Sequence, residues 1–214
     1  MRMLGVRSDG SAVAFIIGFL LAGFLCMVLY IAIVFTGAST YLTGASAERW
    51  TKKEFLMLGP TWHFFFNVPF SVGRGDNSWI VDVDLIAVGP YGVLVVETKF
   101  SSAPIDLGDA ALERRTNDAK VQVEDNSGRV RALLQQVAPG VPIRPVIVFW
   151  GRLVKPPSTP VRRVIGRSED VRIMHGGDAK EWRPKLMEKV VITNEMMDRV
   201  AERIADYQSS FHRS

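Results

Sequence analysis

The stretch from Trp79 to Phe100, WIVDVDLIAVGPYGVLVVETKF, decides the fold of this chain. Two runs rich in Val, Ile and Leu flank the turn residues GPYG (89–92), so the pattern predicts a β-hairpin. If the turn residues form the loop, Val88 lies opposite Val93 on the neighbouring strand. Because successive side chains of a strand point to opposite faces, this register predicts which side chains share a face.

Charged residues interrupt both apolar runs at the open end of the predicted hairpin. Counting outward from the loop places Asp84 opposite Glu97 and Asp82 opposite Lys99, all on one face. The other face is largely apolar and is expected to contain Val81, Val83, Leu85, Ala87, Leu94, Val96, Thr98 and Phe100. The sequence therefore predicts a polar cluster mounted on a rigid sheet.

This polar cluster has two interpretations. A salt-bridge patch on a solvated edge accounts for Asp82 with Lys99. It leaves Asp84 facing Glu97, a like-charge pair that is destabilising unless a cation lies between the carboxylates. A divalent metal ion is the better explanation, because Mg²⁺ binds one or two carboxylates and keeps positions for water and a phosphate.

The same residues carry a resemblance to a known family. An Asp, a gap of about a dozen residues and then Glu-x-Lys at the end of an apolar strand is the signature of the PD-(D/E)XK nuclease superfamily. The segment DVDLIAVGPYGVLVVETK (82–99) resembles the nuclease-related domain (NERD) family within it. Glu48 is similar to the family's upstream acidic residue, Gln122 to its helical glutamine, and RPVIVFWG (144–151) to its next core strand. The resemblance covers about Gly44 to Gly151.

The chain also departs from the family pattern. The family often has His directly after its Asp, where this chain has Leu85. It often has Asn after its Lys and a nearby Gly, where this chain has Phe100 and Ala103. These differences leave the metal-binding residues in place and alter the side chains that would meet a substrate.

The resemblance implies a fold, an activity and a set of site residues. The implied fold is α/β (α+β), a restriction-endonuclease-like domain whose central mixed β-sheet is flanked by helices. An N-terminal transmembrane helix is expected before this domain from the apolar run described below. The implied activity is hydrolysis of phosphodiester bonds in nucleic acid, with DNA as the expected substrate. The metal, Mg²⁺ or Mn²⁺, would be held by Asp84, Glu97, the Thr98 carbonyl and Glu48, and the catalytic set would also include Lys99 and Gln122.

The N-terminal part of the chain predicts a membrane anchor. Residues Ser11 to Thr36 contain no charged side chain and are apolar for long enough to cross a bilayer. A signal peptide is the alternative, because Gly44 to Ala47 are small residues of the kind that a signal peptidase accepts. The apolar run is long for a signal core, so the expected organisation is an N-terminal segment (1–11), a transmembrane helix (12–36), a linker (37–44) and the nuclease-like domain (45–214).

Charge does not decide the orientation of this anchor, since basic residues lie on both sides of the apolar run. A nuclease needs nucleic acid, and this requirement favours a cytosolic domain on a single-pass membrane protein. Cys26 is the only cysteine and lies within the apolar run. An intrachain disulfide and a Cys-based zinc site are therefore excluded.

Patterns outside the hairpin predict the rest of an α/β core. The run WHFFFNVPF (62–70) is typical of a strand, and apolar spacing predicts a helix from about Asn117 to Val137. This helix would bring Gln122 to the rim of the sheet, although an ordinary boundary glutamine fits the same position. A last helix is expected, capped by Thr193 or Asn194. One face of it is apolar and contains Met197, Val200, Ile204 and Tyr207.

A basic segment follows the predicted core. Gly151 to Lys185 contain nine basic and four acidic residues, a net charge of +5, whereas the whole chain carries +4. Within this segment Arg162, Arg163 and Arg167 are the candidates for contacts with the phosphates of nucleic acid. Anionic lipid headgroups would suit the same charges nearly as well, given the predicted anchor.

The sequence thus predicts a membrane-anchored, Mg²⁺- or Mn²⁺-dependent nuclease that binds nucleic acid and a lipid bilayer. The alternative is a non-catalytic, membrane-tethered module that binds nucleic acid or protein on the same fold. The presence of Asp84, Glu97 and Lys99 together argues against a decayed site.

Overall fold

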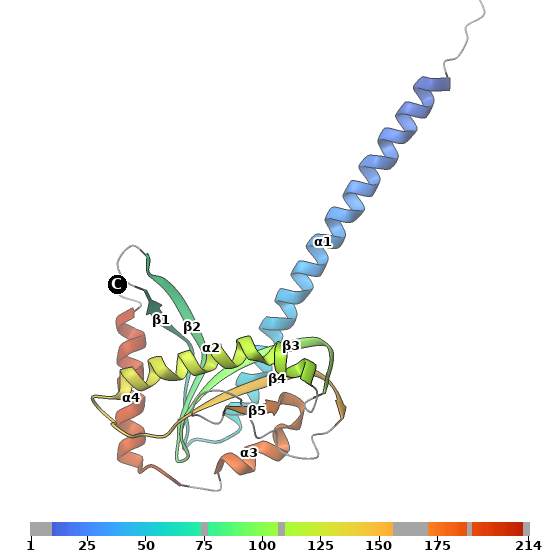
Figure 1. Ribbon diagram of the computed structural model, residues 1–214. Helices are drawn as coiled ribbons and strands as arrows, with labels where there is room; N and C mark the ends of the chain where they lie inside the picture. Colours follow the sequence, from blue (N-terminus) through green and yellow to red (C-terminus); the bar gives the residue numbers. More distant parts are fainter. Residues whose placement is uncertain (1–9, 74–76, 107–109, 156–170, 188–189, 212–214) are drawn as a thin grey trace, which may run out of the picture. The chain divides into compact units, whose positions relative to one another are not determined.

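The structure is a computed structural model that describes residues 10–73, 77–106, 110–155, 171–187 and 190–211. The chain divides into two compact units, residues 1–43 and residues 44–214. A single helix, α1 (Gly10–Leu56), crosses the boundary between them (Figure 1).

The first unit contains the apolar part of α1. The segment Phe15–Ala32 has a mean hydropathy of 2.6, and its side chains are exposed. Within the described residues it is the one stretch long and apolar enough to cross a membrane, a property shared by anchors and signal sequences. Residues 37–44, expected as a linker, are helical, and they contain no proline that would end the helix.

The second unit is built on a mixed five-stranded sheet with the order β1-β2-β3-β4-β5 (Figure 1). The first three strands pair antiparallel, whereas β4 pairs parallel with both β3 and β5. The mixed sheet expected from the sequence is therefore confirmed. Its strands are β1 (His63–Val72), β2 (Trp79–Gly89), β3 (Gly92–Asp106), β4 (Ile143–Lys155) and β5 (Arg172–His175).

The predicted hairpin and its register near the loop are confirmed. Val88 pairs with Val93, and the ladder between β2 and β3 continues to the pair Leu85 and Val96. The loop requires glycine at Gly92, where φ is 118° and a Cβ atom would come 2.5 Å from the carbonyl oxygen of Pro142.

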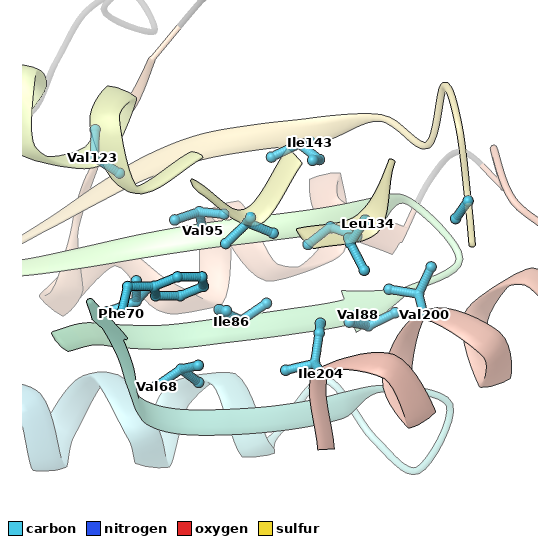
Figure 2. Packing of buried hydrophobic residues seen from close by; sticks show 14 of the residues in the cluster. Val68, Phe70, Ile86, Val88, Val95, Val123, Leu134, Ile143, Val200 and Ile204 are labelled. Atoms are coloured by element: carbon cyan, nitrogen blue, oxygen red, sulfur yellow. The ribbon is translucent and has the colours of Figure 1, made fainter. Parts of the chain in front are cut away.

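Helices cover both faces of this sheet. On one face α2 (Ala110–Leu134) and α4 (Asn194–Phe211) bury the larger apolar cluster, part of which Figure 2 shows. On the other face the end of α1 and the short helix α3 (Ala179–Met187) pack through Phe55 and Trp182. The site residues of the sheet thus lie between two helical layers.

Strand alternation changes at one position along the hairpin. Val83 packs with the cluster under α2 and α4, whereas Leu85 packs with the cluster under α1 and α3. The residue between them, Asp84, lies across from Asn67 of β1, a non-glycine residue with φ of 50°. The expectation that Val81 and Val83 share a face with Leu85 was therefore wrong, because the left-handed residue opposite interrupts the pleat.

Several elements differ from the sequence-based expectation. The helix expected from Asn117 begins at Ala110. The last helix is capped by Thr193, one of the two expected residues, whose Oγ1 accepts a hydrogen bond from the Met196 N–H at 3.3 Å. Strand β5, the 3₁₀ turn Gly176–Asp178 and helix α3 were not predicted. They lie in the basic segment, where charged residues obscure the apolar period.

Candidate metal-dependent active site

The site begins with Asp84 of β2, at the end of the regular ladder with β3. The last cross-strand pair toward it is Leu85 with Val96. Beyond this pair the Asp84 side chain replaces a backbone carbonyl as hydrogen-bond acceptor. Its Oδ2 accepts a hydrogen bond from the Thr98 N–H at 2.7 Å. The carboxylate is thus tied to the backbone of the facing strand.

Glu97 of β3 is the most deeply buried acidic residue of the site. It is 2% exposed, and its Oε1 lies 2.6 Å from the ammonium nitrogen of Lys99. Its Oε2 is also buried, and no residue of the described ranges offers it a hydrogen bond. A buried carboxylate oxygen without a partner is costly, so this atom calls for a ligand.

The pKa values of the two carboxyl groups reflect this environment. Burial, and then the negative charge of Glu97, raises the pKa of Asp84 from 3.8 to about 7, against the opposing hydrogen bond from Thr98. Burial also raises the pKa of Glu97, while its contacts with Lys99 act in the opposite direction. Both carboxyl groups therefore ionise less readily than in water, and a nearby positive charge would favour their ionised forms.

Glu48 approaches this pair from another element. It lies on α1 in the second unit, and its charge adds to the rise in pKa of both Asp84 and Glu97. It is close enough to act through its field. In the described ranges, however, no three His, Cys, Asp or Glu side chains come together as ligands of one metal ion.

Lys99 connects Glu97 to helix α2. Its Nζ donates to Glu97 and also to Oε1 of Gln122, at 3.0 Å. The pairing of Lys99 with Asp82, which the salt-bridge interpretation expected, is not observed, because the ammonium group bonds to Glu97 of its own strand and to Gln122 of α2. Asp82 is exposed and lies opposite Pro69 of β1.

Comparison with protein families follows from this geometry. The model of the nuclease-related domain (NERD) matches residues 43–150, just over half of the 214-residue chain. The chain belongs to the NERD family. No curated protein matches the chain. The part matched as NERD contains all five residues singled out from the sequence, Glu48, Asp84, Glu97, Lys99 and Gln122.

The oxygen atoms of the NERD site fit a hard divalent cation. Asp84 and Glu97 each contribute one carboxylate from adjacent strands. Oε2 of Glu97 is buried and receives no hydrogen bond from the described residues. Two carboxylates are what Mg²⁺ commonly takes from a protein. Burial raises the pKa values of both groups, and a bound cation would favour their ionised forms.

Two residues that hold this site together, Thr51 and Trp150, were not singled out from the sequence. Thr51 of α1 is 2% exposed, and its Oγ1 accepts hydrogen bonds from the Trp150 indole N–H and the Thr98 hydroxyl. The available signal was the position of Thr51 between Ala47 and Phe55 on the apolar stripe of the helix. A polar residue on such a stripe usually has a buried partner.

The basic residues predicted to contact nucleic acid lie outside the part of the chain that the structure describes. Arg162, Arg163 and Arg167 lie at positions 156–170, outside the described residues. Their predicted contacts with phosphates stay a prediction. Of the same segment, Arg183 is described, and it lies 3.5 Å from Glu54 of α1.

Proposed function

We propose that this NERD protein is a membrane-anchored nuclease that hydrolyses phosphodiester bonds of nucleic acid with Mg²⁺ or Mn²⁺. The observation that carries the proposal is the buried Oε2 of Glu97, which has no hydrogen-bond partner in the described part of the chain and adjoins the high-pKa carboxyl of Asp84. A structural salt bridge would satisfy both oxygens of a buried carboxylate. Here one oxygen is satisfied and the other is left for a cation.

The proposed ligands are one oxygen from each carboxylate. Oδ2 of Asp84 is engaged by the Thr98 N–H and Oε1 of Glu97 by Lys99, so Oδ1 and Oε2 are the atoms left to bind metal. The Thr98 backbone carbonyl is proposed as a further ligand, and Glu48 would bind a second metal or position a water. Such an ion, when bound, supplies Lewis acidity toward the scissile phosphate and lowers the pKa of a water ligand.

Lys99 has one N–H donor left for the substrate. An ammonium group has three N–H donors, and the structure uses two of them, on Glu97 and Gln122. The remaining donor would orient the attacking water or bind a phosphate oxygen, where negative charge develops during hydrolysis. Gln122 would keep the lysine pointed at the phosphate.

The apolar part of α1 is proposed to anchor this domain in a bilayer as a single span. Its exposed apolar side chains and length support that role. Substrate access favours a cytosolic position of the domain. Because the helix continues from Phe15 to Leu56, the anchor and Glu48 belong to one element.

Incubation with nucleic acid tests the proposal directly. The full chain in detergent micelles would be mixed with labelled single- and double-stranded DNA and RNA, with Mg²⁺, Mn²⁺ or a chelator. Metal-dependent cleavage by the wild type, lost in Glu97→Gln, is expected. Binding without cleavage under every condition would instead indicate the non-catalytic nucleic-acid-binding module.

A further inference from the structure

Thr51 joins three elements through a single hydroxyl group. Its Oγ1 accepts a hydrogen bond from Nε1 of Trp150 on β4 at 2.7 Å and another from Oγ1 of Thr98 on β3 at 3.2 Å. Thr51 itself lies on α1 and is 2% exposed. Water therefore cannot easily replace either partner.

The position of Thr51 on its helix links it to Glu48. Residues three apart on a helix are neighbours on its surface, so Glu48 lies one turn before Thr51. Ala47, Thr51 and Phe55 form the buried stripe, and Glu48 lies at the edge of it. Any sliding or rotation of the helix that broke the Thr51 contacts would move Glu48 relative to the sheet.

The partner of Thr51 on β3 lies between two site residues. Thr98 separates Glu97 from Lys99 in the chain, and it is held from two directions. Its N–H donates to Asp84 Oδ2, and its hydroxyl donates to Thr51. Thr51 thus contacts the side chain of the same residue whose backbone carbonyl is the proposed metal ligand.

We propose that Thr51 is a positioning residue of the metal site. It fixes the register of α1 against β3 and β4, and so sets the distance from Glu48 to the Asp84 and Glu97 carboxylates. It also holds Thr98 in place through the hydroxyl group of that residue, without touching metal or substrate. This inference rests on the proposed function, because it concerns the geometry of the same site.

A merely structural role would be shared by the other contacts of the helix. Phe55 packs against Trp182 with ring centroids 5.3 Å apart, and Ala47 is buried as well. These apolar contacts hold α1 to the sheet but are non-directional. The Thr51 hydrogen bonds are directional, and one of them comes from the side chain of Thr98, the residue between Glu97 and Lys99. Their loss should therefore affect metal binding beyond its effect on stability.

The test compares three threonine variants of the full chain in detergent micelles. Thr51→Val removes the hydroxyl and keeps the branched shape, whereas Thr51→Ser keeps the hydroxyl. Thr193→Val, which removes the cap of α4, is the matched control for loss of a threonine hydrogen bond far along the chain. Each variant would be measured for Mn²⁺ affinity by the paramagnetic resonance signal of free Mn²⁺, and for kcat and KM of cleavage.

Thr51→Val is expected to weaken Mn²⁺ binding about 10-fold and to lower kcat with little change in KM, as loss of an orienting outer contact commonly does. Thr51→Ser should restore both values to within a factor of about 3 of the wild type. The control should melt at a lower temperature with unchanged Mn²⁺ affinity. Equal Mn²⁺ affinity of Thr51→Val and the wild type would overturn this inference alone.

Trp150→Phe keeps the proposal falsifiable if Thr51→Val does not fold. It removes one of the two donors to Thr51 and retains an aromatic ring for Trp50, whose centroid lies 5.3 Å away. Its Mn²⁺ affinity should fall between those of the wild type and Thr51→Val. An unchanged affinity would count against the positioning role of Thr51. A wild type that binds no Mn²⁺ would overturn the proposed function and this inference together.

Discussion

Substitution of Asp84 by Asn tests the charge balance at the centre of the proposed site. The change removes a negative charge but keeps a side-chain oxygen that can accept the hydrogen bond from the Thr98 N–H. Burial and the charge of Glu97 raise the pKa of Asp84 from 3.8 to about 7. The ionised carboxylate therefore destabilises the metal-free fold above neutral pH.

The size and the pH window follow from this shift. A group whose pKa is raised on folding stabilises the protein below its unfolded pKa, and that contribution is lost as pH rises through the folded pKa. For Asp84 the loss runs from about pH 4 to about pH 7. At 1.36 kcal/mol per pKa unit its upper limit is about 4 kcal/mol. In a domain of this size each kcal/mol corresponds to roughly 2–4 °C in melting temperature.

The assay is thermal unfolding, followed by tryptophan fluorescence, of the chain truncated to begin at Thr40, in chelator and in millimolar Mg²⁺ or Mn²⁺. In chelator at pH 8, Asp84→Asn should melt roughly 5–10 °C above the wild type, and the gap should close toward pH 4. Metal should raise the melting temperature of the wild type and leave the variant unchanged, because it binds the folded site of the wild type.

Asp82→Asn is the matched control, since Asp82 is an exposed carboxylate of the same strand. It should change neither the pH dependence nor the response to metal. The reasoning is refuted if the wild type melts at the same temperature with chelator, Mg²⁺ and Mn²⁺. It is also refuted if metal stabilises Asp84→Asn as strongly as the wild type.

Three other predictions concern catalysis, the anchor and the basic segment. Glu97→Gln should abolish both cleavage and metal-induced stabilisation, whereas Lys99→Ala should lose cleavage and keep metal binding, as shown by paired activity and melting assays. The full-length chain should stay in the membrane fraction after an alkaline wash, and the chain beginning at Thr40 should be soluble; release of the full chain would contradict a span. Replacing Arg162 and Arg163 by Ala should weaken DNA binding and reduce its salt dependence, whereas an unchanged salt slope with weaker binding to anionic vesicles would favour the lipid interpretation.

The sequence predicted those parts of the fold that depend on local patterns. The apolar runs and the GPYG turn (89–92) led to the observed hairpin, and the pairing of Val88 with Val93 followed from loop length. Helix α2 was recognised because Ala119, Val123 and Val130 recur at helical spacing, and all three are buried. Its first turns were missed because the residues from Ala110 onward are mostly polar and charged.

Contacts between distant segments could not be predicted in this way. The contact of Thr51 with Trp150 joins residues 99 positions apart, and no local pattern records it. The pairing of Asp82 with Lys99 was expected from an unbroken ladder, and it failed because the hydrogen-bonded register of the two strands ends before Asp84. Asn67, on a third segment, interrupts the pleat of the hairpin there.

The opening of the ladder explains how two acidic side chains come to share a rigid sheet without merely repelling each other. In a continuous ladder the backbone would satisfy Thr98, and both carboxylates would need separate partners. Here Asp84 replaces a backbone acceptor for Thr98, and Glu97 binds Lys99, so each carboxylate is held by one oxygen. Oε2 of Glu97 is left buried without a partner among the described residues, and burial raises the pKa of both carboxyl groups. A divalent cation bound by the two carboxylates is the proposed partner of this oxygen atom. Metal dependence is therefore the property on which the proposed function depends most.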